Sequence, residues 1–388
     1  MWRCVAGTVV VGFVAFGMSD AQAAGRPAGT TPSGPVAYIV VDADSGTVLA
    51  EREADKQWPP ASMAKMMTVL VALERVRAGR FSLDEPVRVS EKASRTGGSQ
   101  VFLAAGETFT LGQLLEAVMI PSANDASVAV AEHVAGSTTA FVDLMNERAR
   151  QLGMSGTRYQ SVHGLPPEPG QTPDLTTARD LATLGRKLLE HPDAAKWAAT
   201  AESTFRNGSF VMRNTNHLVR TYAGATGLKT GYYAAAGFSV TATARRGDLQ
   251  VMAVVLGEPS KKGCFDEAAR LMSDAFGTWK TVVAARRGVP IGKIPVSGGA
   301  ERHVRAMPTQ DLRLLVKRAE DRGVAVEARI PRLVQAPVQQ RQQLGEVVIR
   351  RGDQELGRVP VVADGEVAST GWLAWLWNRS LTGATLRP

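Results

Sequence analysis

Three short motifs carry the side chains whose types and spacing could do chemistry: Ser62-Met63-Ala64-Lys65, Ser122-Ala123-Asn124 and Lys229-Thr230-Gly231. Pro59-Pro60 ends any preceding helix, and the stretch from Met63 to Glu74 has no glycine or proline, which is typical of a buried helix. On a helix, positions i and i+3 share a face, so Lys65 can reach the hydroxyl of Ser62. A serine hydroxyl becomes a good nucleophile when a neighbouring base takes its proton, and an uncharged lysine can do so.

Ser62 is therefore predicted to be the nucleophile of an acyl-transfer site, with Lys65 as its base. Burial and the positive charge of Lys229 should both lower the pKa of Lys65 and favour its neutral form. The second serine and the asparagine of Ser122-Ala123-Asn124, with the Lys-Thr-Gly strand, would complete such a site. Simpler interpretations are a helix N-cap for Ser62, a solvated helix residue for Lys65 and a capping loop at 122–124.

With these motifs in this order, the chain resembles the serine D-alanyl-D-alanine carboxypeptidases, which are low-molecular-mass penicillin-binding proteins. The resemblance extends over nearly the whole chain. It includes the segments Ala37–Asp42, Gly98–Leu103, Ser122–Ala126, His163–Leu165, Thr177–Asp180 and Asn214–Asn216. The resemblance implies an α+β fold of the serine β-lactamase and DD-peptidase type. In this fold one antiparallel sheet is flanked by helices, and a small all-β domain and a C-terminal amphipathic helix follow.

The resemblance also implies roles for the remaining motif residues. Ser122 would relay a proton between the base and the leaving amine, and Asn124 would hold the substrate's peptide group. Lys229 and Thr230 would bind the free C-terminal carboxylate of the substrate. Gly231 would let the strand approach the substrate, and the backbone N–H groups of Ser62 and Tyr232 are candidates for the oxyanion hole.

Two positions depart from the family pattern. Tyr233 stands where a threonine is common, and Cys264 stands where an arginine commonly precedes Phe265. The missing arginine puts the affinity for the substrate in doubt, and Lys261 or Lys262 could replace it. Cys264 itself is predicted to be an inert packed thiol.

The N-terminal residues read as a targeting segment. Arg3 is followed by a short apolar run, and Ala21-Gln22-Ala23 fits a small-residue cleavage site, so residues 1–23 are predicted to be a signal peptide. The alternative, a membrane anchor, would need a longer apolar run. Removal of this segment leaves Cys264 as the one cysteine of the mature chain, which excludes an internal disulfide.

The pattern along the chain predicts two folded domains. Residues 24–35 are rich in Pro, Gly and Thr and read as a flexible lead-in, and 36–285 read as the catalytic domain. Helices are expected near 111–135, 139–152, 177–190 and 264–285, and strands near 209–221, 226–232, 236–246 and 248–256. Short alternating strands at 289–364 predict a small β-rich domain, and Arg286-Arg287-Gly288 marks the expected boundary.

Residues 365–388 are predicted to form an amphipathic helix on a membrane surface. Trp372, Trp375 and Trp377 lie among leucines, and tryptophan favours the membrane interface. Residues 281–388 also hold 17 Lys and Arg against 10 Asp and Glu, which accounts for 7 of the 8 net positive charges. An anionic membrane is therefore the expected partner rather than nucleic acid, although the tail could also pack on its own domain and the charge could serve solubility.

The function predicted from the sequence is removal of the terminal D-Ala from peptidoglycan stem peptides that end in D-Ala-D-Ala, through an acyl-enzyme on Ser62. β-Lactams should acylate the same serine. No cofactor is expected, and none of the five histidines has metal-ligand spacing. The alternatives are a DD-endopeptidase, a β-lactamase, whose Glu-x-x-Leu-Asn run is absent, and a penicillin-binding scaffold without turnover. The expected location is the periplasmic face of the inner membrane, as an exported peripheral protein.

Overall fold

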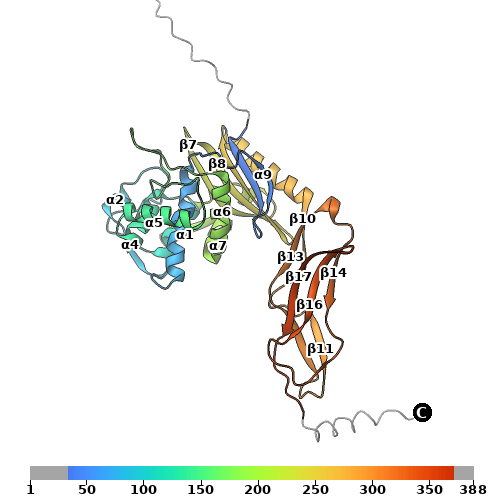
Figure 1. Cartoon of the computed structure of the whole chain (residues 1–388). Coiled ribbons are helices and arrows are strands. Elements are labelled where there is room, and N and C mark those ends of the chain that lie inside the picture. The colour runs from blue at the N-terminus through green and yellow to red at the C-terminus, as the bar shows by residue number, and fades with distance from the viewer. Residues whose placement is uncertain (1–33, 371–388) are drawn as a thin grey trace, which may run out of the picture.

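The computed structural model describes residues 34–370 (Figure 1). The predicted signal segment 1–23, nearly all of the lead-in 24–35 and most of the terminal segment 365–388 lie outside the described residues. Between residues 34 and 370, no helix is both long enough and apolar enough to cross a bilayer.

An α+β domain comes first. Its strands are β1 (Ala37–Asp42), β2 (Val48–Arg52), β3 (Pro86–Arg88), β4 (Thr108–Thr110), β5 (Glu202–Phe205), β6 (Phe210–Arg213), β7 (Ala225–Tyr233), β8 (Gly237–Arg246) and β9 (Leu249–Glu258). Its helices are η1 (Ala61–Ala64), α1 (Lys65–Arg77), α2 (Glu91–Ser94), α3 (Leu111–Met119), α4 (Asn124–Ala135), α5 (Thr138–Gln151), α6 (Ala178–Leu189), α7 (Pro192–Ala199), α8 (Leu218–Thr221) and α9 (Lys261–Thr278).

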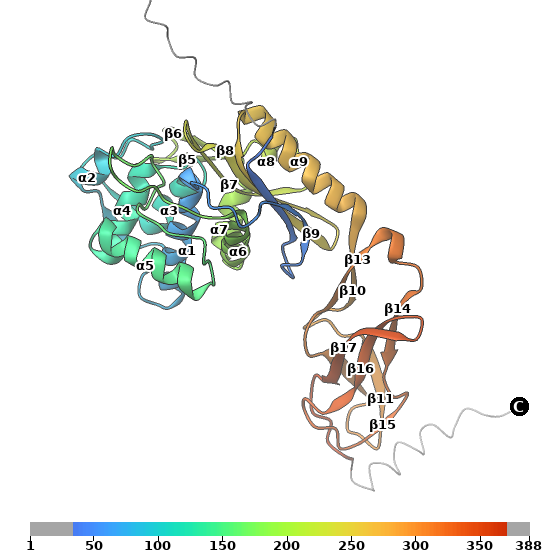
Figure 2. The ribbon, with the colours of Figure 1, turned by 45° about the horizontal axis from the view of Figure 1, so that its top comes forward.

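One antiparallel sheet in the order β2-β1-β9-β8-β7 organises this domain. Strand β9 is apolar along most of its length because both faces of the sheet are covered. Met252, Val254 and Leu256 pack into the core shared with the helical lobe, whereas Val251 and Val255 pack into the core under α9. Figure 2 shows α9 lying along this outer face of the sheet.

The sheet and the lobe meet around α1, whose residues from Lys65 to Leu73 are all buried. Helix α1 packs against α3, α4, α5 and α6, so its first turn is held inside the domain. Strand β7 is the edge strand of the sheet and lies against η1. The fold therefore brings the first and third motifs together, although 163 residues separate the ends of Ser62-to-Lys65 and Thr230 is on the opposite layer.

Three expected elements differ from the structure. The helix expected at 111–135 is broken between Met119 and Asn124, where Pro121 lacks a backbone donor. The strand expected at 209–221 consists of β6 followed by the short helix α8. The helix expected at 264–285 ends at Thr278, because Trp279–Ala285 forms a strand, β10, that pairs with the next domain.

The β-rich domain consequently begins at Trp279 rather than 289. Its elements are β10 (Trp279–Ala285), β11 (Gly292–Ser297), β12 (His303–Pro308), β13 (Leu312–Lys317), η2 (Arg318–Glu320), β14 (Val324–Arg329), β15 (Val334–Gln335), β16 (Gln343–Arg351) and β17 (Gln354–Ala363). They form a six-stranded sheet, β14-β16-β17-β12-β11-β15, and the pair β10-β13. Its end also differs from the expected residue 364, since Val367 bridges to Val338 and the Thr370 amide donates to the Gly298 carbonyl.

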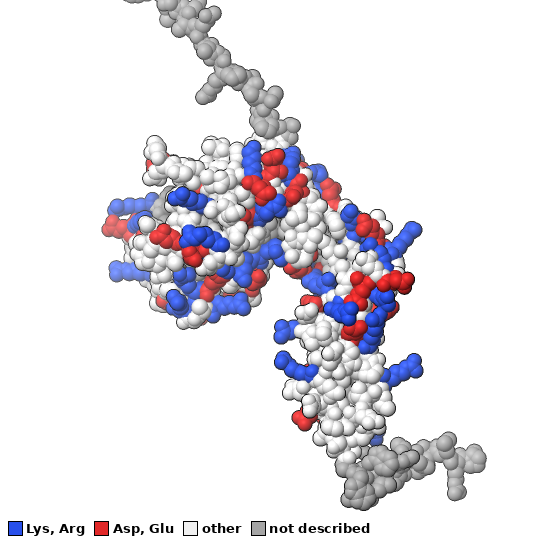
Figure 3. Space-filling view, viewed as in Figure 1, with Lys and Arg blue, Asp and Glu red and all other residues white. Residues whose placement is uncertain are grey.

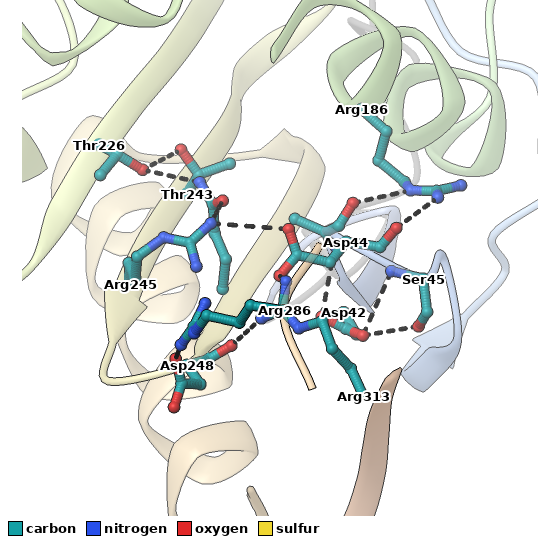
Figure 4. A network of polar contacts seen from close by, with 12 residues as sticks. Asp42, Asp44, Ser45, Arg186, Thr226, Thr243, Arg245, Asp248, Arg286 and Arg313 are labelled. Atoms are coloured by element: carbon teal, nitrogen blue, oxygen red, sulfur yellow. Dashed lines mark hydrogen bonds and ion pairs between the residues drawn. The ribbon is translucent and has the colours of Figure 1, made fainter. Parts of the chain in front are cut away.

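Ion pairs join the two domains at the turn that follows β1 (Figure 4). Asp44 accepts Arg313 of β13 at 2.7 Å and lies 3.6 Å from Arg245 of β8. Arg286 also reaches Asp248 in the β8–β9 turn. Charged side chains of the β-rich domain gather near this junction on the face shown in Figure 3, and the far end of the domain is mostly uncharged there.

Candidate active site

The Ser62 hydroxyl lies on a single turn of 3-10 helix, η1, that leads directly into α1. Ser62 is partly exposed and lines a cavity of about 460 Å³, together with Ser122, Thr230, Gly231 and Tyr232. The structure therefore places predicted residues from all three motifs on one cavity.

Lys65 is the first residue of α1 and is completely buried next to Ser62. Its Nζ lies 3.0 Å from the Ser62 Oγ and 2.7 Å from the carbonyl oxygen of His163. Burial holds the pKa of Lys65 well below its usual value of 10.5, and the positive charge of Lys229 lowers this pKa further. A neutral Lys65 can donate to the carbonyl and accept the proton of Ser62, as a general base must.

Lys229 is also completely buried, behind the surface of β7. Its Nζ has a long contact of 3.4 Å with the Thr230 carbonyl, and Lys229 does not line the cavity. Burial lowers the pKa of Lys229 to about 7. Lys229 is therefore close enough to act on the charge of Lys65, whereas Thr230 is the member of its motif that faces the cavity.

The second motif occupies the break between α3 and α4. Ser122 has a left-handed backbone (φ 68°), which is strained for a residue with a side chain, and its buried Oγ has no hydrogen-bond partner among the described residues. The Asn124 amide nitrogen donates to the Gly97 carbonyl at 2.7 Å, while its buried Oδ1 is likewise unpaired within residues 34–370. A buried polar atom without a partner is rare, so both atoms are suited to accept a proton or an N–H from a substrate.

Strand β7 approaches the nucleophile turn as closely as a glycine allows. A Cβ atom on Gly231 would lie 2.4 Å from the Pro60 carbonyl oxygen and 3.2 Å from the Ser62 nitrogen. This close approach keeps the predicted oxyanion-hole groups, the backbone N–H groups of Ser62 and Tyr232, on neighbouring segments. Tyr232 is 55% exposed and stacks on Phe238 with ring centroids 4.1 Å apart.

The loop that presents the His163 carbonyl to Lys65 is built on a buried aspartate that the sequence analysis did not single out. Asp174 accepts the backbone N–H of Gln160 and Ser161 and the hydroxyl of Ser161 at 2.7 Å. Ser161 Oγ in turn accepts the Gly164 amide at 2.8 Å. A Cβ on Gly164 would lie only 1.9 Å from the Ala61 carbonyl oxygen, so this loop packs directly on the nucleophile turn.

A second buried aspartate supports the Asn124 side of the site. Asp125 accepts the backbone N–H of Leu103 at 3.0 Å and that of Val101 at 3.2 Å. The adjacent Asn124 amide donates to the Ser99 carbonyl at 2.7 Å. Asp125 follows Asn124 in the sequence, and that adjacency is the one signal that could have pointed to it.

The two departures from the family pattern lie in different places. Cys264 lines the cavity but is 2% exposed, and burial raises the pKa of its thiol to about 12, so it stays protonated. Tyr233 is partly buried at the end of β7, outside the cavity. The His163 imidazole is neutral because burial and the charges of Lys65 and Lys92 lower its pKa to about 3.

Carboxylates take no part in the cavity wall. None of the described residues that line it is an aspartate or a glutamate. In the described part of the chain, no three His, Cys, Asp or Glu side chains come together in a way that could hold a metal ion. The chemistry that the described cavity offers is thus a serine, a neutral lysine and hydrogen-bond donors.

Comparison with known proteins identifies relatives of both domains. Residues 30–260 match the family model described as D-alanyl-D-alanine carboxypeptidase, and residues 279–369 match that of the penicillin-binding protein 5 C-terminal domain. The chain is 32% identical to the D-alanyl-D-alanine carboxypeptidase DacF of Bacillus subtilis over 342 residues, which cover 87% of each chain.

Solved structures agree with this. The chain is similar to penicillin-binding protein 5 of Haemophilus influenzae, with a TM-score of 0.66 and 27% identity, over 86% of this chain and 98% of that one. It is also similar to penicillin-binding protein D2 of Listeria monocytogenes in its ampicillin-bound form, with a TM-score of 0.57 and 30% identity, over 62% of this chain and 97% of that one.

Proposed function

We propose that this chain, which belongs to the D-alanyl-D-alanine carboxypeptidase family, removes the terminal D-Ala from peptidoglycan stem peptides that end in D-Ala-D-Ala. The observation that carries the proposal is the pair formed by the Ser62 hydroxyl and the fully buried Lys65 amine, 3.0 Å apart. A serine needs such a base, and a lysine is one only where its pKa is lowered, as it is here.

Acylation follows from this pair. Lys65 takes the Ser62 proton as the oxygen attacks the carbonyl carbon between the two D-alanines, and the backbone N–H groups of Ser62 and Tyr232 stabilise the oxyanion. Collapse breaks the C–N bond, and Ser122 passes the proton from Lys65 to the departing amine. The terminal D-Ala leaves with a neutral or protonated amine, and the rest of the peptide remains as an ester on Ser62.

Deacylation reverses these proton transfers. Water attacks the ester carbonyl while Lys65 accepts its proton, and the shortened peptide departs as Ser62 regains its hydrogen. Asn124 is positioned to hold the peptide group through its unpaired Oδ1. Thr230 and Gly231 border the cavity on β7, where the C-terminal residue of the substrate would bind.

β-Lactams should acylate Ser62 by the same attack and then be released slowly. No carboxylate borders the described cavity to activate water over the acyl bond, which argues against a β-lactamase. The ampicillin-bound state of the Listeria relative is consistent with covalent or tight binding of such compounds at a site of this kind. Rapid hydrolysis of nitrocefin would reverse this ranking.

The test is D-Ala release from diacetyl-Lys-D-Ala-D-Ala by the purified protein and by Ser62→Ala. Release and covalent labelling by fluorescent penicillin should both disappear in Ser62→Ala. Ser99→Ala, which removes another hydroxyl from the same cavity, should still be labelled. Labelling without release would favour a penicillin-binding scaffold, and release from cross-linked peptides alone would favour an endopeptidase.

The proposed location is the periplasmic face of the inner membrane, reached by export and held by the Trp-rich segment. Support comes from the sequence of residues 1–23 and from the tryptophans beyond residue 370. The described chain ends at the end of the β-rich domain far from the α+β domain, so this domain would act as a spacer (Figure 1). Cell fractionation with and without residues 371–388 tests this: loss of the segment should move the protein to the soluble periplasmic fraction.

A further inference from the structure

One wall of the active-site cavity is basic. Arg213, Arg220 and Lys261 line it beside His217, and no acidic residue lies among the described residues of the lining. This wall lies next to the hydroxyl pair of Thr230 and Thr215, whose oxygens are 2.8 Å apart. The composition of the wall suits an anionic group that enters the cavity close to Ser62.

The three cations are not equivalent. Arg213 is paired with Glu202 at 3.1 Å, so its charge is already neutralised. Within residues 34–370, neither Arg220 nor Lys261 forms an ion pair, and Arg220 has only a 3.3 Å contact with the Ala201 carbonyl. Lys261 and Arg220 are therefore the cations of this wall whose charge is available to a ligand.

His217 shows that these two charges converge. Its ring stacks on Phe265 with centroids 5.2 Å apart, and Phe265 and Lys261 both belong to the first turns of α9. Burial lowers the pKa of His217, and the charges of Lys261 and Arg220 lower it further. A neutral imidazole thus lies between the two cations.

The structure also separates Lys261 from its neighbour. Lys262 is paired with Asp266 one turn along α9, and it does not line the cavity. Cys264, on the same helix, contributes a buried and protonated thiol to the wall, which provides no charge. Lys229 is behind β7 and does not line the cavity either.

We propose that Lys261, assisted by Arg220, binds the carboxylate of the terminal D-Ala and sets the preference of this enzyme for substrates with a free C-terminus. The inference rests on the proposed carboxypeptidase function, because it assigns a subsite to that substrate. Lys261 supplies the charge, and the Thr230 hydroxyl supplies a hydrogen bond from β7. Of the two lysines that the sequence leaves open, the structure selects Lys261.

The experiment compares Lys261→Met with Lys262→Met, two neighbouring changes that remove the same charge. Each variant is assayed with diacetyl-Lys-D-Ala-D-Ala and with its terminal amide, which lacks the carboxylate. Lys261→Met should lower kcat/KM for the acid about tenfold, mainly by raising KM, and change kcat/KM for the amide less than about twofold. Lys262→Met should change neither, Arg220→Gln should cause a smaller loss for the acid, and Lys261→Arg should retain activity.

A second readout keeps the two proposals distinguishable. Acylation by labelled penicillin, which bears a carboxylate, should slow in Lys261→Met, and acylation by its methyl ester should not. Equal losses for acid and amide, or for penicillin and its ester, would overturn the carboxylate subsite while leaving the carboxypeptidase in place. A wild-type protein that is acylated but releases no D-Ala would overturn the proposed function, and the acylation rates would still decide the subsite. A protein that does neither refutes both.

Discussion

The close approach of β7 to the nucleophile turn makes Gly231→Ala a direct test of how the site is built. The added Cβ would lie 2.4 Å from the Pro60 carbonyl oxygen, whereas ordinary van der Waals contact begins near 3.4 Å. The strand or the turn must therefore shift by about 1 Å, and a misplacement of that size can lower the rate of an enzyme about 100-fold.

We expect Gly231→Ala to lower kcat/KM for D-Ala release by about 100-fold, mainly through kcat. The rate of acylation by labelled penicillin should fall in parallel, because both reactions need Ser62 and the oxyanion-hole groups in register. β7 is an edge strand and can move, so the loss of stability should stay within about 1–3 kcal/mol, the usual range for overpacking.

Gly277→Ala is the matched control. Gly277 lies in the last turn of α9 without a positive φ, and a Cβ there would meet nothing within 4 Å. This variant should keep full activity and be as stable as the wild type or slightly more so. If Gly231→Ala retained activity within about threefold of wild type, the close approach would not be what positions the nucleophile, and the reasoning would be wrong.

Two further predictions concern buried charges. Lys229→Met should abolish activity but stabilise the protein at neutral pH: the folded-state pKa of about 7 lies below the unfolded value near 10.5, so the unfolded chain binds more protons between these values. The wild-type unfolding free energy should accordingly rise with pH from about 7 to 10.5, and denaturant titrations of Lys229→Met should lack that rise; an identical pH profile in both proteins would contradict the buried state of Lys229. Asp125→Ala should destabilise the protein by about 2–5 kcal/mol, because it strands the buried amides of Val101 and Leu103. Asp125→Asn should lose clearly less, and equal losses in thermal unfolding would show that packing rather than these hydrogen bonds decides the effect.

Much of the site could be predicted from the sequence because its residues occur as local motifs. The Ser62–Lys65 contact follows from helical spacing alone, and β8 and β9 follow from apolar runs around the Arg246-Gly247-Asp248 turn. The roles of the motif residues in turnover stay predictions until the variants are measured.

The rest depends on contacts between distant segments. Asp174 supports the His163 loop across 13 residues or more, and nothing local to it shows that it is buried. The end of α9 was placed too late, because Trp279–Ala285 continues an apolar pattern and becomes a strand only by pairing with β13. Which of Lys261 and Lys262 faces the cavity depends on where α9 begins, after the Ser260 cap, and that start is not evident from the lysines themselves.

The buried charges and strained backbone of the site also bear on whether the protein turns over its substrate. A fold needs none of them: two completely buried lysines, a left-handed Ser122 and the unpaired atoms of Ser122 and Asn124 each lower stability. A scaffold that only held penicillin would still need Ser62 and its base, but not an unpaired Ser122 hydroxyl, which acts in protonating a leaving group. A β-lactam has no leaving amine that departs, whereas a D-Ala-D-Ala peptide does. The retention of Ser122 in this strained position is therefore better explained by release of a terminal residue than by binding alone.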